Sequence, residues 1–124
     1  MRLIPTMLAI SFLCACTEEI PDVSGTWVGG TTMIVDAEEK KIELELRLTQ
    51  AEKDVEGSLC WGEIDLMISA SSLEGHELFL ESEWEGGTIQ LRGLVTDDAI
   101  SGRFQYRFVH EREAFPALFE VTRR

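Results

Sequence analysis

The sequence predicts an all-β protein, and three observations lead to this prediction. Several segments after residue 23 alternate apolar and polar side chains with period two, and no long segment shows helical spacing. Gly and Asp recur at short intervals, as they do where a hairpin reverses. An apolar residue stands two positions before Gly57, Gly75, Gly93 and Gly102, so this pattern recurs every 18, 18 and 9 residues. Nine residues make about one strand plus one turn, which favours a meander.

The clearest strand is Ile42–Thr49, in which four aliphatic side chains share one face and charged or polar side chains share the other. This is the pattern of a half-buried strand in an antiparallel sheet. The predicted strands are, in order, Gly25–Val35, Ile42–Thr49, Val55–Trp61, Glu63–Ala70, Glu77–Trp84, Thr88–Val95, Ile100–His110 and Phe115–Arg123. The acidic and basic run Asp36–Lys41 between the first two is expected to be a hydrated hairpin tip.

About eight such strands predict an up-and-down antiparallel barrel for residues 24–124, because closing a meander removes its exposed edges. The alternative that the same alternation permits is a two-sheet β-sandwich. A barrel of this many short strands has an interior that side chains roughly fill.

Residues 1–15 have the composition of an export signal. They carry one charge, at Arg2, and an apolar stretch far shorter than the ~20 residues of a membrane-spanning helix. The stretch ends in Leu13-Cys14-Ala15-Cys16, which resembles the lipobox of bacterial lipoproteins. A small residue is needed before the acceptor, so Ala15 selects Cys16 rather than Cys14. An ordinary secretory signal is the alternative.

The resemblance to lipoproteins implies that residues 1–15 are removed, that Cys16 is acylated and that residues 16–23 form a short tether. Acyl chains alone can then hold the domain on a membrane, since each buried CH₂ contributes about 0.8 kcal/mol. Thr17 rather than Asp follows Cys16, which implies sorting to the outer membrane of a diderm envelope.

The composition restricts the partners. The chain has 23 Asp and Glu against 11 Lys and Arg, a net charge of −12, which repels nucleic acid and anionic headgroups. Nucleic acid is therefore not an expected partner, and contact with the membrane is expected through Cys16 alone. Cys60 is the one cysteine left in the domain, so no internal disulfide is expected, and we predict that Cys60 is buried as a small apolar residue.

The start of the first strand, Gly25-x-Trp27, resembles the signature of lipocalins and wider calycin barrels. In that family the tryptophan packs across the closed end of the barrel, beneath an arginine from the last strand. The resemblance implies this structural role for Trp27, with Arg123 as its partner and Arg124 as the alternative. Gly25 would let the chain enter the barrel closely.

No catalytic motif, phosphate loop or dinucleotide fingerprint is present, so we expect no enzyme activity and no cofactor. His76 and His110 show no metal-ligand spacing and are expected in exposed turns, so no metal is predicted. Glu81, Glu83 and Glu85 alternate on one strand, where a solvated outer face is preferred over an acid–base site.

The aromatic residues Phe104, Tyr106 and Phe108 share one face of a strand. Core packing is the preferred interpretation; alternatively, they line an apolar pocket at an open barrel mouth with Trp61 or Trp84. The opposite face carries Arg103, Gln105 and Arg107, which are expected to pair with acids on neighbouring strands.

Three functions remain open. The preferred one is a non-catalytic envelope lipoprotein whose small barrel binds a protein partner or a small apolar ligand. The second is a periplasmic barrel that resembles bacterial inhibitors of secreted metalloproteases, although those carry a disulfide that Cys60 alone cannot form. The third is a lipocalin-like carrier of a small hydrophobic molecule, which requires an open interior. The sequence does not predict the oligomeric state.

Overall fold

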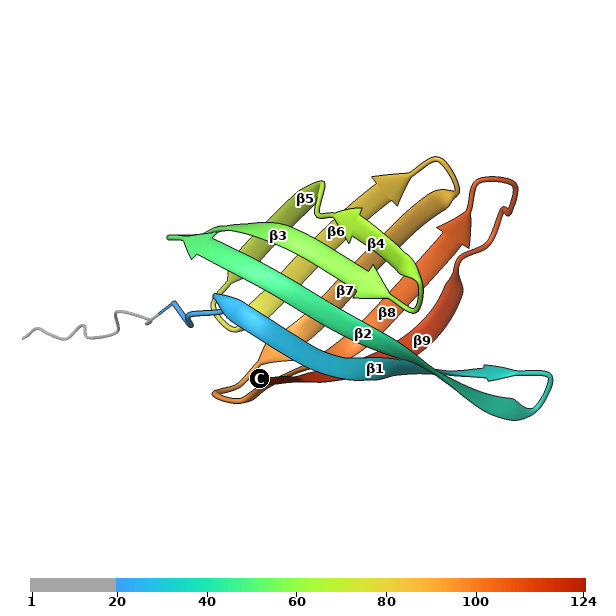
Figure 1. Ribbon diagram of the computed structural model, residues 1–124, viewed down its shortest axis with the longest axis horizontal. Coiled ribbons are helices and arrows are strands. Elements are labelled where there is room, and N and C mark those ends of the chain that lie inside the picture. The colour runs from blue at the N-terminus through green and yellow to red at the C-terminus, as the bar shows by residue number, and fades with distance from the viewer. Residues whose placement is uncertain (1–19) are drawn as a thin grey trace, which may run out of the picture.

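The computed structural model describes residues 20–124, and this part of the chain is all-β, as the sequence predicts (Figure 1). The signal segment and Cys16 lie outside the described residues. The strands are β1 (Gly25–Val35), β2 (Glu38–Ala51), β3 (Asp54–Trp61), β4 (Ile64–Met67), β5 (Ala70–Glu74), β6 (Glu77–Trp84), β7 (Gly87–Val95), β8 (Ala99–Phe108) and β9 (Phe115–Arg123).

All nine strands belong to one antiparallel sheet in the order β4-β3-β2-β1-β9-β8-β7-β6-β5. Every neighbouring pair except β1 and β9 is consecutive in the chain, which is the expected up-and-down order. The pairing of β1 with β9 brings the beginning and the end of the domain together, and Figure 1 shows both at the same end of the molecule. A single sheet favours the rolled arrangement over two separate sheets.

The two edges of the sheet, β4 and β5, are joined by only two residues. Ile68 donates its backbone N–H to Gly57 on β3 at 3.0 Å, and Ser69 donates to Glu81 on β6 at 2.7 Å. The Ser71 hydroxyl also donates to the Val55 carbonyl at 2.7 Å. The backbone ladder is therefore not continuous around the roll, but β4 and β5 together fill one strand position between β3 and β6.

Two element boundaries differ from the prediction. The expected strand Glu63–Ala70 stops at Met67, and the chain crosses to β6 to form β5, which the sequence analysis missed. The hairpin tip is also narrower than expected, because β2 already begins at Glu38. Asp36 and Ala37 have φ values of 52° and 64°, the positive values that a two-residue hairpin turn requires.

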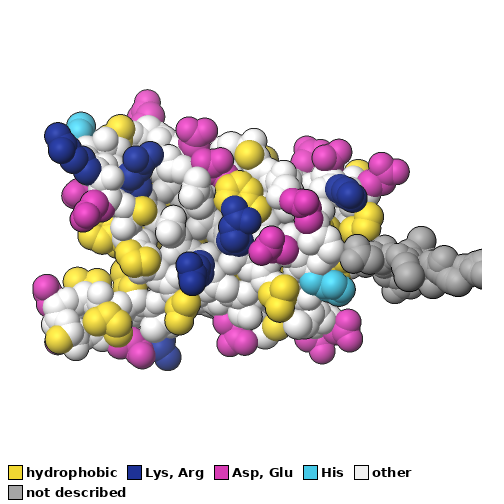
Figure 2. All heavy atoms as spheres, turned by 180° about the vertical axis from the view of Figure 1, so that it is seen from behind, with side chains coloured by type: hydrophobic (Ala, Val, Ile, Leu, Met, Phe, Trp, Pro, Cys, Tyr) yellow, Lys and Arg dark blue, Asp and Glu magenta, His cyan; other side chains and the backbone are white. Residues whose placement is uncertain are grey.

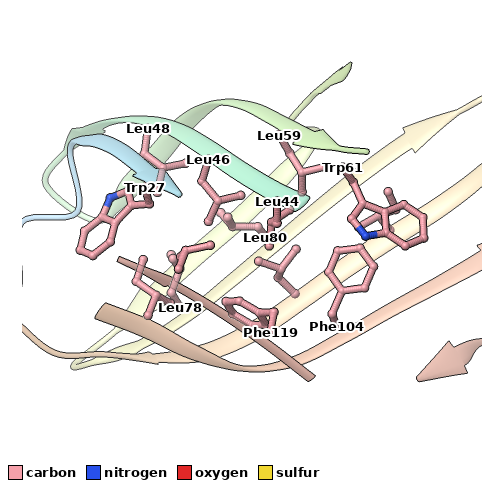
Figure 3. Packing of buried hydrophobic residues seen from close by; sticks show 14 of the residues in the cluster. Trp27, Leu44, Leu46, Leu48, Leu59, Trp61, Leu78, Leu80, Phe104 and Phe119 are labelled. Carbon is pink, nitrogen blue, oxygen red and sulfur yellow. The ribbon is translucent and has the colours of Figure 1, made fainter. Parts of the chain in front are cut away.

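The interior is filled by apolar side chains from both halves of the sheet (Figure 3). On β2, Leu44, Leu46 and Leu48 are buried while the residues between them face outward. Burying such a side chain contributes about 1.5–3 kcal/mol. The buried core further includes Val23, Trp27, Met33, Val55, Leu59, Trp61, Leu73, Leu78, Leu80, Ile89, Leu91, Val95, Ile100, Phe104, Ala117, Phe119 and Val121.

Candidate functional site

Trp27 closes the end of the barrel at which the domain begins, which we call the proximal end (Figure 3). Its side chain is fully buried, and its indole N–H donates to the Val23 carbonyl at 2.9 Å. The Arg123 guanidinium lies 4.2 Å above the indole, so the two residues that the sequence analysis paired are in contact. A cation over an indole contributes about 0.5–2 kcal/mol.

Arg123 also ties the entering chain to the last strand. It donates to the carbonyl of Ser24 at 2.8 Å and to that of Asp22 at 2.9 Å. The backbone N–H of Ser24 donates to the Asp22 carboxylate, and this bond, more than the Ser24 side chain or Arg123, lowers the pKa of Asp22. The proximal end is thus a structural closure in which the polar groups have partners.

Gly25 has a different reason for being glycine from the one expected. A Cβ at this position would make only ordinary contact with Arg123, so the close entry of the chain does not require glycine. The backbone φ of Gly25 is +126°, a conformation that L residues rarely adopt. The conformation of the backbone, and not the available space, selects glycine here.

The opposite end, the distal end, contains the second buried tryptophan. Trp61 packs against Phe104 with ring centroids 4.9 Å apart, and both are buried. The indole N–H of Trp61 donates to the Thr31 hydroxyl at 2.9 Å, and that hydroxyl donates to the Ile42 carbonyl at 3.3 Å. The core interpretation therefore holds for Trp61 and Phe104, which fill the interior.

Tyr106 continues this aromatic stack from the core to the surface. Its ring lies 4.7 Å from Trp61, stacks on Phe115 at 5.2 Å and meets the edge of Phe108 at 5.4 Å. Burial raises the pKa of the Tyr106 phenol. Phe108 and Phe115 are 41% and 40% exposed, and the adjacent Val109 is 64% exposed. We call Tyr106, Phe108, Val109 and Phe115 the distal rim.

A groove of about 550 Å³ opens beside the distal rim, between β1 and β9. The backbone N–H of Arg124 donates to the Thr26 carbonyl, so Thr26 and Arg124 form a hydrogen-bonded pair of the antiparallel ladder. Such pairs recur at every second residue, and the last regular one joins Thr32 to Leu118. The next bonded pair in this register would place Ile34 opposite Pro116, which has no N–H. The strands separate there, and Met33, Phe104, Ala117 and Leu118 line the opening with other residues.

Among the other candidate residues, Trp84 lies in the hairpin next to the distal rim, since Gly87 pairs with Phe108 and Gly86 accepts the backbone N–H of Val109. Trp84 is half-buried at the end of β6, pairs with Gly87 and lies against Gly86. Within residues 20–124, the Trp84 ring makes no contact with Phe104, Tyr106 or Phe108, whereas Trp61 contacts Phe104 and Tyr106. Glu81 and Glu83 alternate with the buried Ser82, which is the expected outer face.

The predictions for Cys60, the two histidines and the arginines of β8 have different outcomes. Cys60 is half-buried and faces outward between Leu59 and Trp61, so its expected burial was wrong. His76 and His110 are exposed. The expected pairing of Arg103 and Arg107 with acids was also wrong: no ion pair of either is found within residues 20–124. Their cross-strand neighbours on β7 are Arg92 and Thr88, neither of which carries a carboxylate.

Phe115 and Met33 belong to the distal end but were not among the predicted site residues. Phe115 faces Tyr106 across β8 and β9, and Met33 accepts a long 3.6 Å contact from the Tyr106 hydroxyl. A search for aromatic residues on both sides of the loop after Phe108 could have found Phe115. The contact with Met33 spans 73 positions and has no local sequence signal.

In the described part of the chain, no three His, Cys, Asp or Glu side chains gather in a way that could hold a metal ion. Residues 20–124 also contain no helix long and apolar enough to cross a membrane. Comparison with protein-family models and with curated proteins finds no match to this chain.

Proposed function

We propose that this chain is a non-catalytic lipoprotein of the bacterial envelope that binds a protein partner through its distal rim. The observation that carries the proposal is an aromatic stack that continues from the buried Trp61 to the exposed rings of Phe108 and Phe115. Aromatic side chains anchored in a core present large apolar area at little entropic cost, which is typical of the centre of a protein interface.

The placement of the rim supports a role away from the anchor. The described chain enters at the proximal end, beneath Arg123, whereas the connection between β8 and β9, which carries the rim, lies at the other end of the barrel (Figure 1). A domain held through a lipid on Cys16 would then direct the rim away from its attachment. The net charge of −12 agrees with a domain that its tether holds off the membrane, since anionic headgroups repel such a surface.

A small apolar ligand is the second candidate, and the groove between β1 and β9 favours it. Its volume of about 550 Å³ lies within the ~300–1,000 Å³ of ligand sites, and Met33, Phe104 and Ala117 supply apolar lining. A carrier with its ligand inside the barrel has less support, because Trp61, Phe104 and the leucines of β2 occupy the interior.

The rim proposal is tested by cross-linking capture from native envelopes. We expect the double substitution Phe108→Ser and Phe115→Ser to abolish capture of a partner that the wild type retains. Leu94→Ser is the matched control, because Leu94 is exposed to 59% on β7 but is not part of the rim. Equal capture by the rim variant and the wild type would contradict the proposal.

The anchoring proposal needs a separate test, because Cys16 lies outside the described residues. We expect Cys16→Ser to be released from the membrane fraction or to keep its signal segment. Mass spectrometry of the wild-type N-terminus should detect the acyl groups. A mature-sized Cys16→Ser protein that still sediments with membranes would show that the lipid anchor is wrong.

A further inference from the structure

The outer face of β8 concentrates positive charge in an acidic protein. Arg103 and Arg107 project outward with Gln105 between them, and all three are exposed. Across the ladder, Arg103 stands directly opposite Arg92, a like-charge pair that destabilises a sheet. Figure 2 shows dark blue side chains from a corner of this face to its middle, with acidic side chains beside them and along its margin.

Arg112, in the loop between β8 and β9, lines a pocket with Arg107 and extends this positive charge. Arg92 has Glu77 at 3.9 Å and lies over the Phe79 ring, whereas no ion pair within residues 20–124 involves Arg103, Arg107 or Arg112. On the β9 side, Arg103 faces Leu118, which is uncharged. We call Arg103, Arg107 and Arg112 the basic face; Glu111 and Glu113 flank Arg112 in the chain but form no ion pair with it within residues 20–124.

A pocket of about 220 Å³ lies at the distal end of the basic face. Arg107 and Arg112 line it together with the side chains of Gln90, Gln105 and Thr88. These groups can all donate hydrogen bonds, although the Gln90 amide already donates to Glu81 at 3.3 Å. The planar fork of a guanidinium matches a carboxylate with two parallel hydrogen bonds. The pocket is therefore suited to one anionic group.

The pocket adjoins the distal rim, because its lining residues Arg107 and Ala114 directly precede Phe108 and Phe115 in the chain, although the rim's rings and Arg107 lie on opposite faces of β8. Arginine beside aromatic rings is the composition that dominates binding energy at protein interfaces. We infer that the basic face binds an acidic segment of a protein partner, with a Glu or Asp carboxylate between Arg107 and Arg112 and an apolar side chain of the same segment on the rim. This inference rests on the proposed function and names the chemistry of its partner.

Charge complementarity selects this occupant over an anionic membrane. The basic face is local, whereas the net charge of −12 makes the rest of the surface repel an extended anionic layer. A short acidic segment reaches the arginines without bringing further negative charge close to the other faces. The Arg–carboxylate contact also gives a defined direction to a segment that the rings alone would hold loosely.

The inference is tested with the full chain in nanodiscs and two fluorescent peptides. One peptide has two Glu residues flanking a Phe, and the other has Gln in place of Glu. We expect the Glu peptide to bind at least about tenfold more tightly, which equals about 1.4 kcal/mol. Binding should weaken as the salt concentration rises from about 50 to about 300 mM.

The double substitution Arg107→Gln and Arg112→Gln should weaken binding of the Glu peptide by about tenfold or more. The matched control is Arg47→Gln with Lys53→Gln, which changes the net charge equally on other strands and turns and should leave binding within about twofold. Circular dichroism of both variants should match the wild type, because all four side chains are exposed.

The peptide experiment would overturn the inference if the two peptides bound equally or if the Glu peptide did not bind below about 1 mM. Tighter binding of inorganic phosphate or of phosphatidylglycerol vesicles would also overturn it. Self-association that the arginine variant abolishes would instead make a second copy the occupant. In the capture experiment, loss of the partner with the rim variant but not with the arginine variant would leave the proposed function intact and reject this inference. Retention with the rim variant would reject the proposed function itself.

Discussion

Both ends of the barrel contain a buried tryptophan, but the groups that cover the two indole rings differ. At the proximal end, Trp27 is covered by Arg123, and its indole N–H is bonded to the chain that enters there. At the distal end, Trp61 is followed outward by Tyr106 and then by the exposed ring of Phe115. The difference teaches that one end is covered by Arg123 and the entering segment, while the other leaves aromatic rings exposed.

The largest expected effect that separates the two ends is on stability. Trp27→Ala should lower the free energy of unfolding by about 3–5 kcal/mol, because it removes a fully buried indole and leaves a cavity. Phe115→Ala should cost about 1 kcal/mol or less, since this ring is 40% exposed. Urea unfolding followed by circular dichroism measures both. Equal losses would break the distinction between a closed end and an end with exposed rings.

A smaller effect is expected from the cation above Trp27. Arg123→Met should lower the free energy of unfolding by about 1–2 kcal/mol, because the cation–π contact and two hydrogen bonds to the entering chain are lost. Arg47→Met is the control and should cost less than about 1 kcal/mol, since its ion pair with Glu45 is exposed. If the control costs as much as Arg123→Met, the closure of the proximal end is not specific to Arg123.

The smallest expected effect is a pH dependence at the distal end. Burial raises the pKa of Tyr106 above the value of free tyrosine, so the folded state holds the phenol proton more tightly than the unfolded state. The stability from this group is complete below the unfolded pKa and is lost as the pH rises through the folded pKa. The chain has one tyrosine, so phenolate absorbance reports Tyr106 directly. A titration midpoint at or below the usual tyrosine value would contradict the burial, and Tyr106→Phe should abolish the signal.

Much of the fold could be predicted because alternation with period two is a local signal. Ile42–Thr49 shows it over a whole strand, and its leucines are buried where the pattern places them. β5 was missed because the segment Ala70–Glu74 buries only Leu73 deeply, and its serines give no strand signal. The early start of β2 at Glu38 was missed for a related reason: exposed charged residues pair through their backbones, which apolar periodicity cannot show.

The candidate site was less predictable because it depends on which strands become neighbours. The Trp27–Arg123 pair could be anticipated from a short motif and the position of the last strand. By contrast, the hydrogen bond from Trp61 to Thr31 joins residues 30 positions apart in the sequence. The separation of β1 from β9 depends on the one register in which Pro116 falls opposite Ile34, and the sequence does not show that register. The cross-strand neighbours of Arg103 could not be predicted from the sequence either, because the register that places Arg92 opposite it is set only when β7 and β8 pair.

The pairing of β1 with β9 has a consequence for the time course of folding. β1 finds one of its two neighbours about 90 residues later in the chain, so its second edge stays open until the last strand has been synthesised. Contacts this distant in sequence slow the folding of β proteins, because the entropy of closing a long loop is lost before the contacts stabilise the structure. We therefore expect β1 to complete its backbone pairing late in folding. The contacts of Arg123 with Trp27 and the entering chain would then form after the hairpins, and would not nucleate folding.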